Sequence, residues 1–149
     1  MTPSGNGWLI AAGWLSIAAA LLHLGCIVGG APWFRALGAG EEMARAAERG
    51  AMFPTVITLF IATVLFVWAA YAFSAAGLIV RLPLARTALV AICAVLLIRG
   101  LGAPLVQLWR PDLSPLFLYV SSAIVTVFGV IFTFGTWKAW AMLSIKGIS

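Results

Sequence analysis

The chain has very little charge. Only 9% of its 149 residues are charged, whereas 64% are hydrophobic. A soluble domain carries about 25% charged residues, most of them on its surface. With so few charges, this protein must place much of its surface against an apolar phase. The composition therefore excludes an ordinary soluble domain and predicts one membrane-embedded domain over residues 1–149.

Cysteine and histidine are also scarce, and this limits metal and redox chemistry. Cys26 and Cys93 lie inside apolar segments, and the one histidine, His23, has only Cys26 nearby as a second ligand type. Two such side chains do not make a metal site. Buried membrane cysteines usually behave as small hydrophobic residues. We therefore expect no metal site and no structural disulfide, and the sequence identifies no cofactor.

Long apolar runs fill most of the chain and predict four transmembrane helices. Their expected ranges are about 8–30, 52–80, 84–108 and 116–142. A helix needs about 20 residues to cross about 30 Å of hydrocarbon, and backbone in lipid must satisfy its own hydrogen bonds. The first run is preceded by MTPSGNGW, which has no basic residue, so we expect a retained helix and no signal peptide. The predicted fold is an all-α, four-helix transmembrane bundle.

The basic residues indicate an orientation. They lie between and at the ends of the apolar runs, as head-group anchors do, so the net charge of +5 predicts no nucleic-acid partner. An even number of spans places both termini on one side, together with Arg81, Arg86, Lys138 and Lys146. Lysine and arginine are equally numerous on the other side, but acidic residues accompany them there. This asymmetry favours both termini in the cytoplasm.

The one hydrophilic segment, GAGEEMARAAERG, predicts a short interfacial helix at about 41–49 in the first loop. Glu41 and Glu42 fall in its first turn, where acidic residues suit the helix dipole. Glu41 and Arg45, and Arg45 and Glu48, are spaced for pairing along the helix. The segment is interpreted as a solvated helix over the bundle; the alternative is that one glutamate turns inward.

Two ionisable residues, His23 and Arg99, lie within the predicted spans. Charge inside a membrane is costly enough to indicate a functional site. Both residues fall about two thirds of the way along helices that run in the same direction, so we expect them at similar depth, toward the loop helix. Two alternatives stay open: Arg99 snorkels to the head groups, and His23 is a neutral residue hydrogen-bonded within the bundle.

Small and hydroxyl-bearing residues recur at helical spacing in the last span. They are Tyr119, Ser122, Thr126, Gly129, Thr133 and Thr136. Membrane helices pack through such faces, so we expect this stripe to face inward and four large residues to face lipid or a partner: Ile124, Val125, Phe128 and Phe132. Gly25 and Gly29 form a GxxxG pair in the first span.

Together these residues predict a polar pocket at the non-cytoplasmic end of the bundle. The candidate ligand-binding residues are His23, Glu41, Glu42, Arg99, Tyr119 and Ser122. No residue is assigned a catalytic role.

Several stretches are similar to small four-helix bacterial inner-membrane proteins of uncharacterised activity. They are HLGCIVGGAPWFRALGAGEEMARAAERG, FPTVITL, LIRGLG and YVSSAIVTVFG. The resemblance implies this architecture and a bacterial inner-membrane location, but no activity.

Three classes of function remain open from the sequence. In the first, the protein binds or passes a small amphipathic or polar-headed molecule, with Arg99 and His23 at the head group. In the second, it is an accessory subunit of a larger membrane complex or a homo-oligomer. In the third, it is an enzyme acting on a lipid or quinone, with His23 as acid or base; this needs an orienting carboxylate, such as Glu41 or Glu42. The sequence favours binding or transport.

Overall fold

The computed structural model describes residues 6–109 and 115–144, and within these ranges it contains six helices and no strand. The helices are α1 (Gly7–Ala36), α2 (Glu41–Glu48), α3 (Phe53–Ala75), α4 (Ala85–Leu101), α5 (Ala103–Trp109) and α6 (Pro115–Ser144). The all-α class is confirmed. Three of these helices, α1, α3 and α6, are long and apolar enough to cross a membrane.

The third predicted span is not one continuous helix. The sequence predicts a helix over 84–108, but α4 ends at Leu101 and α5 begins at Ala103, with Gly102 between them. Pro104 explains the break, because proline cannot donate a backbone hydrogen bond and disfavours helical geometry in the preceding residue. With 17 residues, α4 alone is about 26 Å long. It is therefore shorter than the three apolar helices described above.

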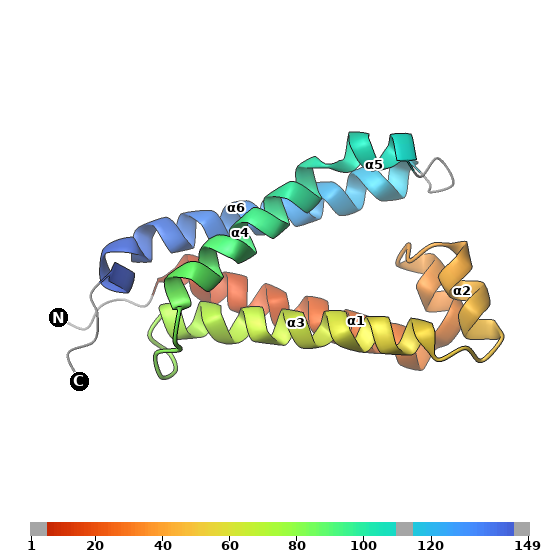
Figure 1. The fold of residues 1–149 in the computed structure, drawn as a ribbon, viewed down its shortest axis with the longest axis horizontal. Coiled ribbons are helices and arrows are strands. Elements are labelled where there is room, and N and C mark those ends of the chain that lie inside the picture. The colour runs from red at the N-terminus through yellow and green to blue at the C-terminus, as the bar shows by residue number, and fades with distance from the viewer. Residues whose placement is uncertain (1–5, 110–114, 145–149) are drawn as a thin grey trace.

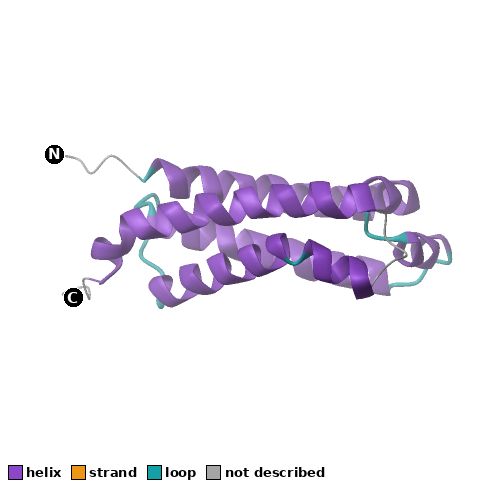
Figure 2. Ribbon diagram, turned by 90° about the horizontal axis from the view of Figure 1, so that it is seen from above, coloured by secondary structure: helices purple, strands orange, loops and turns teal. Residues whose placement is uncertain are grey.

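The long helices form two closely packed pairs, α1 with α3 and α4 with α6 (Figure 1). The start of α1, the α3–α4 connection and the end of α6 lie at one end of the molecule, and α2 and α5 lie at the other (Figures 1 and 2). Hydrogen bonds join the elements at the first end. Asn6 Nδ2 donates to the Gly135 carbonyl oxygen at 2.6 Å, and Arg81 donates to the carbonyls of Met142 and Leu143.

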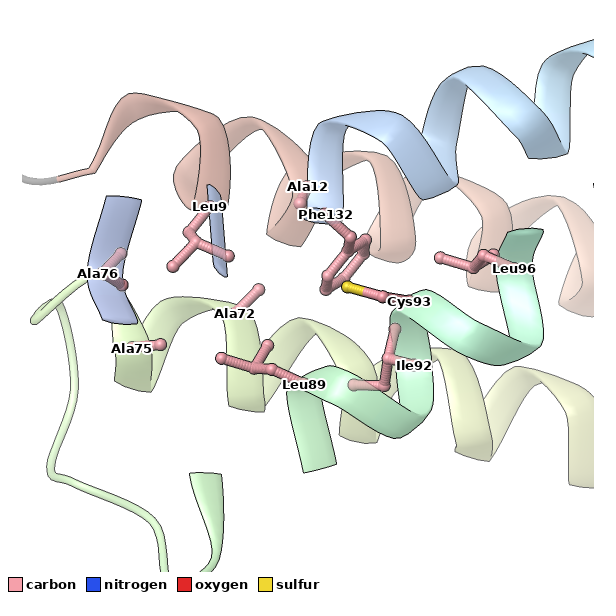
Figure 3. Packing of buried hydrophobic residues seen from close by; sticks show 11 residues of the cluster. Leu9, Ala12, Ala72, Ala75, Ala76, Leu89, Ile92, Cys93, Leu96 and Phe132 are labelled. Atoms are coloured by element: carbon pink, nitrogen blue, oxygen red, sulfur yellow. The ribbon is translucent and has the colours of Figure 1, made fainter. Parts of the chain in front are cut away.

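The main hydrophobic cluster lies in the half of the molecule nearest the α3–α4 connection, where the two pairs meet (Figure 3). Leu9 of α1, Leu89 of α4 and Phe132 of α6 are completely buried there. Small residues allow the close approach: a Cβ atom added to Gly135 would lie 2.8 Å from Leu9 Cγ. Membrane helices associate largely through this kind of tight van der Waals packing.

Toward α2 and α5 the two pairs diverge (Figure 1). A second cluster lies between α1 and α3, around Ala20, Ala62 and Leu65, and Phe128 of α6 packs against it. At the far end, α6 approaches the segment that follows α1. There the Phe117 ring of α6 lies against Gly38, just after α1.

The prediction for the faces of α6 is partly wrong. Phe132, expected to face outward, is fully buried, whereas Thr133, expected inward, is exposed. Thr133 Oγ1 donates to the Gly129 carbonyl at 2.7 Å. A hydroxyl satisfied by its own helix in this way needs no partner from another helix. Ser122, Gly129 and Thr136, which are every second member of the stripe, are buried and face inward.

Candidate functional site

Arg99 lies in the last turn of α4, beside α6. Its Nη1 donates to the Ser122 hydroxyl oxygen at 3.2 Å, and Ser122 is 3% exposed. The neighbouring residue, Gly100, explains the contact. A Cβ atom there would lie 2.8 Å from the backbone nitrogen of Thr126, so the lack of a side chain lets α4 and α6 approach. Arg99 then reaches Ser122, one turn before Thr126 on α6.

The charge of Arg99 is not balanced by a carboxylate within residues 6–109 and 115–144. A guanidinium has five N–H donors, and Ser122 supplies the one hydrogen-bonding partner that the described residues give it. Arg86, near the start of α4, packs on Trp140, as expected of residues at a membrane interface. Arg99 lies thirteen residues further along, about 20 Å from Arg86 along the helix axis.

His23 is half-buried on α1 and uses its own helix as a partner. Its Nδ1 lies 2.7 Å from the Ala19 carbonyl oxygen, which can only accept, so Nδ1 carries the proton. Within the described ranges, His23 has no hydrogen bond to Arg99 or Ser122. The structure therefore does not join His23 and Arg99 directly, although both lie in the half of the molecule where the helix pairs diverge.

Two of the three glutamates of α2, Glu41 and Glu48, form ion pairs with arginines other than Arg99. Arg35 donates to both carboxylate oxygens of Glu41 at 2.9 Å and to Glu48 at 2.7 Å, and Arg45 donates to Glu41 at 3.0 Å. The predicted pairing of Glu41 with Arg45 is confirmed. The hydrogen bonds from Arg35, and then the one from Arg45, lower the pKa of Glu41 to about 2. The hydrogen bond from Arg35 also lowers the pKa of Glu48.

Arg35 is the residue of this network that the sequence did not single out. It reaches α2 because α1 kinks at Gly30, whose φ of 64° and ψ of −151° leave the helical region. Pro32 follows in the new segment. The same bend lays the Trp33 ring over the GxxxG pair: a Cβ atom on Gly25 would lie 2.9 Å from it. The two adjacent glycines followed by a proline were the available signal for this break.

The remaining two candidates are both exposed. Glu42 is exposed, and Tyr119 is 50% exposed on α6.

Gln107 on α5 was not a candidate, yet its Oε1 is buried with no hydrogen-bond partner in the described part of the chain. An unsatisfied buried acceptor costs about 1–3 kcal/mol. Gln107 is the chain's one glutamine, in the apolar run APLVQLW, and this was the signal that could have identified it.

The described ranges contain no group of three or more metal-ligating side chains. Comparison of the chain with protein-family models, curated proteins and solved structures finds no match. The resemblance to small four-helix inner-membrane proteins therefore stays a prediction.

Proposed function

We propose that this protein crosses a bacterial inner membrane four times, with both termini in the cytoplasm, and binds or passes a small amphipathic molecule with an anionic or polar head. The head group would lie at Arg99 and Ser122. One observation carries the proposal: Arg99, in the last turn of α4 and about 20 Å from Arg86 along the helix axis, has a single, neutral partner among the described residues. At the same end of the molecule, Arg35 and Arg45 are paired with carboxylates.

In a four-span arrangement the charge of Arg99 is costly. An arginine at the centre of a transmembrane helix costs about 2.5–3.5 kcal/mol on insertion scales, and less toward an interface. One serine hydroxyl uses a single donor of the five. A carboxylate or phosphate would neutralise the charge and accept two parallel N–H bonds. On the adjoining helix α5, the Oε1 of Gln107 is a buried acceptor that also has no partner among the described residues.

The divergence of the two helix pairs supports the apolar part of the proposal. On α1, His23 and Leu24 are only half-buried in this half of the molecule. Phe128 of α6 packs against the cluster between α1 and α3. Toward α2 and α5 the ribbons of the two pairs diverge (Figure 1). An acyl or other apolar tail entering sideways from the bilayer would contact these side chains.

The two other classes have less support. An accessory subunit would use small-residue faces for docking, but Ala62, Ala69 and Gly129 are buried within the chain's own helix pairs. An enzyme with His23 as acid or base needs an orienting carboxylate. The hydrogen bond of His23 goes to a backbone carbonyl instead, and Glu41 is committed to Arg35 and Arg45.

Binding of oleate, a single-chain carboxylate, tests the proposal. We expect the purified full-length protein to bind oleate saturably in mild detergent, and Arg99→Gln to weaken binding about tenfold or more, as loss of a charged hydrogen bond does. Arg99→Lys keeps the charge without the bidentate geometry and should fall between the two. Arg49→Gln, which removes an exposed arginine after α2, is the matched control and should leave binding unchanged. Equal binding by the Arg99→Gln variant and the unaltered protein would refute the proposal.

A further inference from the structure

Basic side chains seated on tryptophan rings surround the end of the molecule that holds the α3–α4 connection. The guanidinium of Arg86 lies over the Trp140 ring, 3.7 Å from its centroid, and the Lys138 ammonium is 5.9 Å from the centroid of Trp8. These residues come from α4, α6 and α1. Cation–π contacts of this kind hold each charge beside its ring. We refer to Arg86, Lys138 and their two tryptophans as the basic belt.

The charge at this end has one sign. Arg81 also lies here, donating to the carbonyls of Met142 and Leu143 at 3.0 and 2.9 Å in the last turn of α6, where a cation suits the helix dipole. The chain has four acidic residues: three belong to α2 at the opposite end, and Asp112 lies between α5 and α6 in the sequence. No acidic residue therefore belongs to any sequence segment that forms this end.

We infer that the basic belt binds the head groups of anionic phospholipids, with Arg86 as the main anchor and Lys138 as the second. A guanidinium stacked on an indole keeps its N–H groups in a plane parallel to the ring and directed sideways, where they fit the oxygens of a phosphodiester bidentately. Among the described residues, the Trp140 ring is the one partner that the structure gives Arg86. Trp140 itself is 38% exposed, as expected of a residue at the bilayer interface.

The partner is bilayer lipid because of where the charges lie. Trp8, Trp137 and Trp140 mark the same level as the basic residues, at one end of three apolar helices. Basic residues beside a membrane surface are attracted by its anionic lipids, each contributing about fivefold to binding. This inference does not rest on the Arg99 site, which lies about 20 Å away along α4.

Lipid retention in native mass spectrometry tests the inference. The full-length protein would be reconstituted with equal amounts of phosphatidylglycerol and phosphatidylcholine, then transferred to mild detergent. We expect the protein to retain phosphatidylglycerol in preference. Arg86→Gln and Lys138→Gln should each lower the ratio of retained phosphatidylglycerol to phosphatidylcholine about fivefold. Arg86→Lys should keep part of the preference, because it keeps the charge but loses the bidentate geometry.

Two controls make the outcome decisive. Arg49→Gln removes the same charge at the opposite end and should leave the ratio unchanged. Oleate binding should be unaffected by Arg86→Gln, which separates this surface from the proposed Arg99 site. If Arg86→Gln does not fold, Lys138→Gln carries the test alone. Equal retention of the two lipids by the unaltered protein would overturn the inference, and so would an equal loss in the Arg49→Gln variant.

Discussion

At the scale of single residues, the environments of Arg99 and Arg35 differ, although both are arginines near the end of an apolar helix. Arg35 has two carboxylate partners at hydrogen-bond distance. Arg99 has one hydroxyl, and it is brought there because Gly100 lets α4 and α6 approach. This difference in partners, rather than the residue type, is what makes Arg99 the candidate for an anionic ligand.

Phe132 supports a prediction at this scale, because its ring fills the centre of the main cluster and is fully buried. Phe132→Ala should lower the free energy of unfolding by about 3 kcal/mol, through lost contacts and a residual cavity. Phe60→Ala, at an exposed position on α3, is the matched control and should change it little. Unfolding in increasing denaturing detergent measures both, and equal losses would contradict the burial assigned to Phe132.

At the scale of elements, α2 is held to the end of α1 by ionised side chains. Glu41 has a pKa of about 2, below the ordinary value of 4.5. A carboxyl whose folded pKa is depressed stabilises the docked state fully above its ordinary pKa, and this contribution is lost as the pH falls toward the folded value. Docking of α2 should therefore be complete at pH 7 and weaken between about pH 4.5 and pH 2. The pair is solvent-exposed, so the effect should stay local to α2.

Amide hydrogen exchange of α2, corrected for the intrinsic effect of pH, checks this prediction. Exchange should be slower at pH 7 than at pH 3. In the Arg35→Gln variant, exchange at pH 7 should be as fast as exchange of the unaltered protein at pH 3, because the substitution removes a partner from both Glu41 and Glu48. Arg49→Gln keeps these pairs and should behave as the unaltered protein does. A pH-independent rate in the unaltered protein would contradict the role given to Arg35.

The sequence predicted some elements and missed others for identifiable reasons. The apolar runs gave the long helices, and the acidic and basic spacing gave α2 and its Glu41–Arg45 pair. The kink at Gly30 and the break at Gly102 were missed because hydropathy does not report backbone geometry. The inward face of α6 was only partly predicted: Ser122, Gly129 and Thr136 are buried, but Phe132 is buried in place of Thr133. Hydroxyls that bond to their own helix do not reveal which way they point. The pairing of Arg35 with Glu41 and Glu48 depends on the kink at Gly30, and the sequence therefore did not predict it.

At the scale of the whole molecule, the proposed site requires that α4 and α5 cross the membrane together. They run from Ala85 to Trp109, interrupted only at Gly102, and neither is among the three helices that qualify as spans by themselves. If they do cross, Arg99 lies inside the hydrocarbon and its charge needs a partner there. If they do not, Arg99 is at a surface and needs none.

Membrane topology measures this most directly. Reporter fusions or accessibility labelling would be placed within α2, at Leu84 in the α3–α4 connection, and after Ser149. The account predicts α2 in the periplasm and both Leu84 and the C-terminal end in the cytoplasm, because four crossings return the chain to its starting side. A C-terminal end on the side opposite to Leu84 would show that α6 is the only crossing after that connection. Arg99 would then lie outside the hydrocarbon, and this result would contradict the proposed binding site.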